Sequence, residues 1–140
     1  ATHVLFQDVA LQSDVVSAEL RWADRIRNHN NVFVDGKQDY SVQIWDVNSV
    51  LLTELFSTDP GDDPLTDWNT RVSDLSAFIG STIRIAFIVE TKLNIPSFHI
   101  PPANYFNLHL DDVIMEVSTG GLGAPALVKV TGLARANGLP

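Results

Sequence analysis

The chain has 140 residues, of which 45% are hydrophobic and 19% charged, a composition typical of one globular domain and not of a disordered segment. Its net charge of −8 makes duplex nucleic acid and anionic membrane surfaces poor electrostatic partners. Cysteine is absent, which excludes disulfides, cysteine-ligated zinc and thiol catalysis. No apolar run reaches the ~20 residues of a membrane-spanning helix.

Four strands are predicted in the first half of the chain, where β-competent apolar residues, partly alternating with polar ones, are bounded by turn residues. These stretches are residues 4–11, 18–26, 40–45 and 50–56. In the second stretch, Leu20, Trp22 and Ile26 share one face. Residues 48–49 are expected to turn a hairpin between the last two strands.

The second half continues with predicted strands over residues 68–72, 83–89 and 106–117. Residues 58–64 contain two prolines, which lack an N–H donor, so this acidic segment is expected to be a turn. Residues 73–78 can form one helical turn, which Gly80 ends. Residues 92–104 form a proline-rich loop, and loops of such length are often functional.

Short strands separated by turn clusters, without long helical periodicity, predict an all-β fold built as an antiparallel β-sandwich. We expect residues 1–118 to form this β-sandwich module. Residues 119–140 begin with glycine and other small residues. They are interpreted as a linker and C-terminal extension that can add one strand, over residues 126–131.

The stretch from Trp68 to Val117 carries the most informative order of residues. It reads W-x-x-R-V-x-D-L-S-A-F-I-G-S-T-I-R-I-A-F and, after the proline-rich loop, F-N-L-H-L-D-D-V-I-M-E-V. This order resembles the closing half of the MAM-like and galactose-binding-like β-sandwich modules of secreted bacterial proteins, and the resemblance covers residues 4–117. It implies a jelly-roll sandwich within a larger secreted or cell-surface protein.

Two adjacent carboxylates, Asp111 and Asp112, lie in the middle of the last of these strands. Neighbouring residues of a strand point to opposite faces, so we expect at least one of them near the core, where a carboxylate needs a cation or hydrogen bonds. The resemblance implies that the pair helps to hold a structural Ca2+ with oxygens from the N-terminal segment around Asp8. The alternative is that Asp112 accepts backbone N–H groups or pairs with Arg84, without metal.

The chain contains three tryptophans, the side chains on which many carbohydrate modules stack sugars. Trp22 shares a face with apolar residues and is expected in the core, and the resemblance implies core packing for Trp68. Trp45 shares a face with Ser41 and Gln43, so it is the tryptophan expected on a polar surface. The alternative is that Trp45 packs under a loop.

Polar residues of several strands face away from the apolar side chains of the same strand. If these strands are neighbours, one sheet face carries arginines, amides, a histidine and a tryptophan, which is the chemistry of a carbohydrate-binding surface. The alternative is an ordinary solvated sheet face. The candidate ligand-binding residues are Arg21, Arg25, Gln43, Trp45, Arg84, Asn107 and His109.

The sequence contains no nucleophile elbow, H-E-x-x-H motif, P-loop or G-x-G-x-x-G pattern. We therefore expect no enzyme, but a carbohydrate-binding or adhesion module of a larger secreted or cell-surface bacterial protein, with carbohydrate or neighbouring domains as partners. The main alternative is a structural spacer or assembly domain without a ligand, and the third is a small hydrolase. Exposure of Trp45 beside Gln43 and Arg84 would favour carbohydrate binding, and its coverage would favour the spacer.

Overall fold

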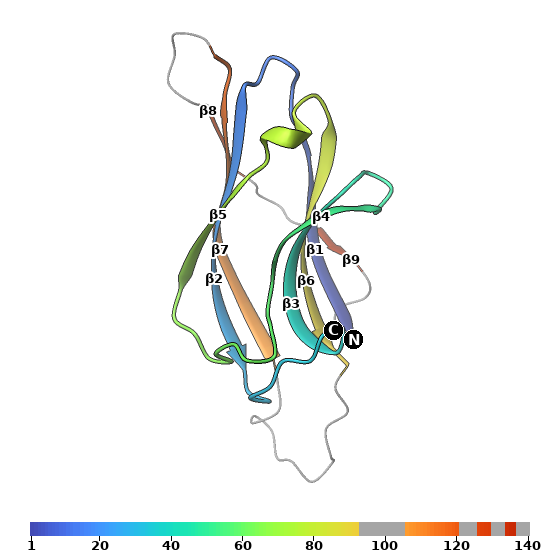
Figure 1. Ribbon diagram of the computed structural model, residues 1–140, viewed down its shortest axis with the longest axis vertical. Coiled ribbons are helices and arrows are strands. Elements are labelled where there is room, and N and C mark those ends of the chain that lie inside the picture. Colours follow the sequence, from blue (N-terminus) through green and yellow to red (C-terminus); the bar gives the residue numbers. More distant parts are fainter. Residues whose placement is uncertain (93–105, 121–125, 130–133, 137–140) are drawn as a thin grey trace.

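The computed structural model describes residues 1–92, 106–120, 126–129 and 134–136, and shows two antiparallel β-sheets facing one another (Figure 1). The strands are β1 (Thr2–Ala10), β2 (Ser17–Asn28), β3 (Gln38–Trp45), β4 (Leu51–Ser57), β5 (Asn69–Asp74), β6 (Thr82–Thr91), β7 (Phe106–Ser118), β8 (Ala126–Lys129) and β9 (Ala134–Ala136). The helical turn expected near residue 76 is a short 3-10 turn, η1 (Ser76–Phe78). The prediction of an all-β, antiparallel fold is confirmed.

Consecutive strands mostly belong to different sheets. One sheet has the order β4-β3-β6-β1-β9, and the other has the order β5-β2-β7-β8. The β3–β4 and β7–β8 connections join neighbours within a sheet, whereas each of the other connections crosses to the opposite sheet. Pairing partners therefore lie far apart in the sequence, as with Thr2 opposite Glu90 and Ser17 opposite Ser118.

The residues beyond position 118 contribute to both sheets. β8, inside the stretch predicted as an added strand, pairs with β7, and β9 pairs with β1. The predicted proline-rich loop from residue 93 onward, and the glycine-rich residues 121–125, lie outside the described residues. Within the described part of the chain, no helix has the length and apolar character needed to cross a membrane.

Inward-facing side chains from both sheets fill the space between them. Tyr40, Val42, Ile44, Ile83, Ile85 and Phe87 are at most 2% exposed. Leu108 and Leu110 are partly buried and pack against this core. Trp22 is 1% exposed, and its ring meets Phe87 edge-on with 6.1 Å between the centroids. The predicted core position of Trp22 is confirmed.

A polar group lies inside this core. Asp24, on the inward face of β2, is fully buried. Its Oδ2 accepts hydrogen bonds from the Trp22 indole N–H at 3.0 Å and the Tyr40 hydroxyl at 3.1 Å. It also forms an ion pair with Arg71 of β5. The Arg71 guanidinium lies 3.7 Å from the centre of the Phe56 ring on β4, so side chains from both sheets meet around one carboxylate.

A β-bulge interrupts β7 at Asp111 and Asp112. Arg21 of β2 faces Ile114, whereas Ala23 faces Asp111, so β7 has one residue more than β2 over this stretch. Asp112 has a left-handed conformation with φ of 48°, and its N–H donates to Asp111 Oδ1 at 2.8 Å. Both residues are exposed. The expectation that one of them lies near the core is wrong, because the bulge accommodates both outside it.

Candidate functional site

The candidate ligand-binding residues fall into two groups on the outer faces of the two sheets. β3 and β6 are neighbours in the five-stranded sheet and bring Gln43, Trp45 and Arg84 together. β2 and β7 are neighbours in the four-stranded sheet. Their outer face carries the remaining residues, which are Arg21, Arg25, Asn107 and His109. The condition for one shared face, that all these strands are neighbours, is therefore not met.

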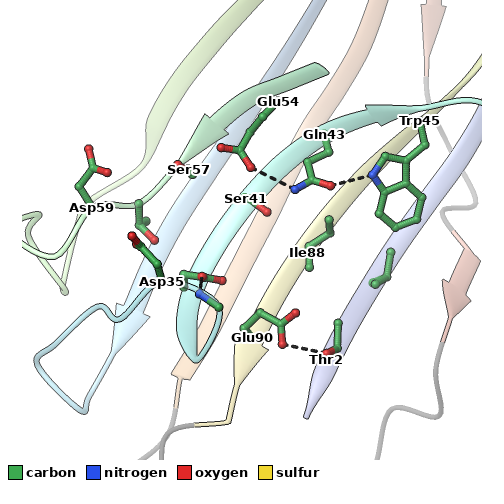
Figure 2. Close-up of a pocket in the computed structure, with 14 residues that line it drawn as sticks. Thr2, Asp35, Ser41, Gln43, Trp45, Glu54, Ser57, Asp59, Ile88 and Glu90 are labelled. Atoms are coloured by element: carbon green, nitrogen blue, oxygen red, sulfur yellow. Dashed lines mark hydrogen bonds between the residues drawn. The ribbon is translucent and has the colours of Figure 1, made fainter. Parts of the chain in front are cut away.

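The outer face of the five-stranded sheet is hollowed over β1, β3, β4 and β6 (Figure 2). The depression has a volume of about 540 Å3 and extends to the turns that precede β3 and follow β4. We call it the acidic hollow, because it is lined by the carboxylates of Asp35, Asp39, Glu54, Asp59 and Glu90. Within the described residues only Glu90 among them has an ion-pair partner, Lys92, at 2.9 Å.

Trp45 lines the hollow and is held in place from two sides. Its indole N–H donates to Gln43 Oε1 at 2.7 Å, and Gln43 Nε2 donates to Glu54 Oε2 at 3.0 Å. The ring packs against a small apolar cluster on the outer face that includes Ile88, and Trp45 is half-buried. Figure 2 shows the ring on the same face as Glu54 and Glu90. Trp45 is thus neither fully exposed nor covered, and it lies beside Gln43 on the outer face of the sheet with its ring on apolar residues.

The carboxylates of the hollow act on one another. Burial raises the pKa of Asp39 above its ordinary value of 3.8. Nearby negative charges raise this pKa further, namely those of Glu90, Asp35 and Glu54. The backbone N–H of Gly36 donates to Asp39 Oδ2 and acts in the opposite direction. The hollow therefore attracts cations and ligands rich in N–H and O–H donors.

Arg84 lies opposite Trp45 on β6 but is engaged outside the hollow. Its Nε and Nη2 donate to the Asp8 carboxylate at 2.8 and 3.2 Å, and its Nη1 donates to Ser49 Oγ at 2.8 Å. Arg84 therefore neutralises Asp8. The alternative pairing of Arg84 with Asp112 is wrong, because these residues belong to different sheets and Arg84 already has a partner.

The residues implied for a calcium site do not come together. Asp8 lies on β1 of the five-stranded sheet and is paired with Arg84, whereas Asp111 and Asp112 lie on β7 of the other sheet. Among the residues that the structure describes, no group of three or more His, Cys, Asp or Glu side chains is placed to hold a metal ion. These three aspartates do not fit one shared site, and a structural calcium ion stays a prediction.

A second group of polar side chains lies on the outer face of the four-stranded sheet. Trp68, just before β5, is 49% exposed, and its ring centroid lies 6.3 Å from that of His109. The core position implied for Trp68 is therefore wrong. Arg21 lies nearer the beginning of β2 and forms an ion pair with Glu19 at 2.9 Å. We call the remaining group the Trp68 surface, which consists of Arg25, Arg27, Trp68, Asn107 and His109.

No protein-family model matches the chain, and no curated protein matches it. The likeness to MAM-like and galactose-binding-like modules therefore rests on the residue order between Trp68 and Val117, and its functional implications are proposals.

Proposed function

We propose that the chain is a non-catalytic carbohydrate-binding module of the jelly-roll type, and that the acidic hollow is its sugar site. The observation that carries this proposal is the fixed row of Trp45, Gln43 and Glu54 on the wall of a hollow rich in hydrogen-bond acceptors. A sugar ring has an apolar C–H face and a rim of hydroxyl groups. It therefore needs an aromatic plane with polar groups beside it.

The side chains of the hollow have different roles in binding. Trp45 stacks on the sugar ring, and the carboxylates accept hydrogen bonds from its hydroxyl groups. Hydrogen bonds to a charged group contribute ~1.5–3 kcal/mol, against ~0.5–1.5 kcal/mol for neutral pairs. Because Gln43 already holds Trp45 and Glu54, less side-chain freedom is lost on binding. Neutral sugars and amino sugars suit this site, whereas acidic sugars are repelled by its carboxylates.

The wider role follows from the resemblance. The MAM-like and galactose-binding-like modules belong to larger secreted proteins, so we propose that this module serves a secreted or cell-surface protein. One such module binds weakly, and the parent protein gains strength through several modules at once. Catalysis is not part of the proposal, because the sequence carries none of the common catalytic motifs.

Affinity electrophoresis in gels that contain β-glucan, mannan, galactan or chitosan tests the site. We expect at least one polymer to retard the wild-type protein. Trp45→Ala and Glu54→Gln should each weaken the association at least tenfold, a loss of about 1.4 kcal/mol. Trp68→Ala, the same change on the other sheet, is the matched control and should retain binding. Equal mobility with and without every polymer would contradict the proposal.

The assembly alternative is favoured by one observation. The hairpin that joins β3 and β4 projects from the sandwich (Figure 1). It carries Val47, Val50, Leu51 and Leu52, which are 46% to 56% exposed. Exposed apolar groups that lie together often mark protein contacts. Sedimentation of the wild type and a Leu51→Asp variant distinguishes the two roles. Assembly would be favoured if the wild type self-associates, the variant does not, and the wild type binds no sugar.

A further inference from the structure

We propose that the Trp68 surface is a second ligand site, separate from the acidic hollow, and that it binds a sugar carrying a carboxylate group. Trp68 stacks on the sugar ring, and Arg25 and Arg27 receive the carboxylate. This site lies on the other sheet and takes a ligand of the opposite charge preference from that of the hollow.

Strand register aligns the central residues of this surface. Asp24 of β2 lies opposite Asn69 of β5, and Arg25 and Trp68 are the residues next to this pair. On the other side of β2, Arg25 lies opposite His109 of β7. Because β2 runs between β5 and β7, a Trp68 ring that contacts His109 passes close to Arg25. An aromatic plane just before β5, a guanidinium on β2 and an imidazole on β7 therefore lie close together.

The arginines of this surface differ in charge pairing from three other arginines whose side chains the structure describes. Arg21, Arg71 and Arg84 each form an ion pair with a carboxylate. In the described part of the chain, Arg25 and Arg27 form none. Moreover, Arg25 Nε is buried without a hydrogen-bond partner. A partly desolvated cation without a partner is unfavourable, and an anion bound to the other nitrogens of the same guanidinium relieves that cost.

Either arginine can receive a carboxylate. Arg25 and Arg27 lie on the same face of β2, ~7 Å apart along the strand. A guanidinium binds a carboxylate through two parallel hydrogen bonds, which fix its orientation. Asn107, opposite Arg27, and His109 add polar groups that can bind hydroxyls. One aromatic plane beside a guanidinium fork matches a pyranose ring with one carboxylate, as in a uronic acid.

Charge around the site argues against a dense polyanion. Asp111 lies on the same strand as His109, two residues further along, and is exposed. The chain as a whole has a net charge of −8, so a polymer of closely spaced sulfates or phosphates is repelled at a distance. A polymer with isolated carboxylates meets less repulsion, because each anionic group can be neutralised by Arg25 or Arg27.

Calorimetric titration with oligogalacturonate and with its methyl ester tests the proposal, since the ester keeps the same sugar rings but carries a neutral group in place of each carboxylate. We expect the wild type to bind the acid form at least tenfold more tightly than the ester, with an affinity that falls as salt is added. Trp68→Ala and Arg25→Gln should each weaken this binding at least tenfold. Arg21→Gln, a matched arginine on the same strand, and Trp45→Ala should leave it within about twofold.

Several results would overturn the proposal. These are no saturable binding of the acid form at millimolar concentration, equal binding of the ester, or an equal effect of Arg25→Gln and Arg21→Gln. Heparin binding that needs Arg25 but not Trp68 would show charge attraction alone. If a variant fails to fold, two other measurements replace it. These are the binding of the acid form by Arg25→Lys and the shift of the Trp68 indole N–H resonance when the acid form is added to the wild type. Neutral sugars bound in the hollow would leave the proposed function intact in every case.

Discussion

At Asp24, one carboxylate oxygen accepts hydrogen bonds from Trp22 and Tyr40 and faces Arg71, while the other is buried without a partner. Burying such charges costs about as much as their attraction returns. We therefore expect the group to determine how the sheets pack more than it adds to stability. Alternation along β2 places Asp24 on the inward face with Leu20, but it cannot reveal that an arginine arrives from β5.

The three tryptophans should differ in what they contribute to stability. Trp22→Ala should cost ~3–5 kcal/mol of unfolding free energy, because it empties part of the core. Trp68→Ala should cost no more than about 0.5 kcal/mol, as at an exposed site. Trp45→Ala should lie between them, since its ring is half-buried. Urea unfolding gives all three values, and a Trp45 loss equal to that of Trp22 would make Trp45 a core residue and favour the assembly role.

Asp39 should lower the stability of the fold at neutral pH while it contributes to sugar binding. The pKa of Asp39 in the folded protein is raised above the ordinary 3.8, so protonation of Asp39 stabilises the fold. This stabilisation is fully present below pH 3.8 and is lost as the pH rises through the pKa of the folded protein. At neutral pH the ionised carboxylate therefore weakens the fold. Asp39→Asn should raise the melting temperature at neutral pH. The same variant should bind neutral sugars less well, and a lowered melting temperature would contradict the electrostatic argument.

Among the elements, the bulge in β7 was the one that reversed a prediction. Buried and partly buried residues fall on even positions before it, Leu108 and Leu110, and on odd positions after it, Val113 and Met115. This change of parity is visible in the sequence and indicates an extra residue at 111–112. Strict alternation through two aspartates instead predicts a carboxylate facing the core, which is why that expectation was wrong.

The conformation of Asp112 leads to a test of the bulge. Its φ of 48° is accessible to Gly, tolerated by Asp and strained for β-branched residues. Asp112→Gly should leave the unfolding free energy unchanged or raise it by up to about 1 kcal/mol. Asp112→Val should lower it by ~1–3 kcal/mol. Urea unfolding of both variants provides the measurement, and equal stabilities would show that this conformation is not needed.

Strands were predictable as elements, but their grouping into sheets was not. The turn expected at residues 48–49 does join β3 to β4, because hairpins depend on local sequence. By contrast, β2 pairs with β7 and β3 with β6 through contacts between distant segments. Alternation is the same for a strand in either sheet. The candidate residues were therefore recognised one by one, while their division between two faces required the structure.

For the molecule as a whole, stability should fall in alkaline solution. Burial raises the pKa of Tyr40 well above its ordinary value of 10.0, and the charge of Asp24 adds to this. Above pH 10 the unfolded chain loses the phenolic proton that the folded protein keeps, so the unfolding free energy decreases as the pH rises. This contribution is fully present below pH 10. Urea unfolding between about pH 8 and about pH 11 should show a shallower decline for Tyr40→Phe than for the wild type.

Chelation tests the calcium ion that the resemblance implies. A ligand bound only to the folded state stabilises it by RT ln(1 + [L]/Kd), so a structural ion would be seen as a melting temperature lowered by excess chelator and restored by Ca2+. Because Asp8 lies on a different sheet from Asp111 and Asp112, Asp8→Asn should not change the size of that response. Loss of the response in Asp8→Asn would contradict the separation of these residues.

The order of the strands also determines when the protein can fold during its synthesis. Among the strands that the structure describes, β1 pairs with β6 and β9, and β2 pairs with β5 and β7. At about 5–20 residues per second of translation, the first strands leave the ribosome several seconds before their partners. Such non-local pairing is slow to form in any case. Until β6 and β7 emerge, only the β3–β4 and β2–β5 pairs of the described sheets can form, so we expect a product released before that point not to reach this fold.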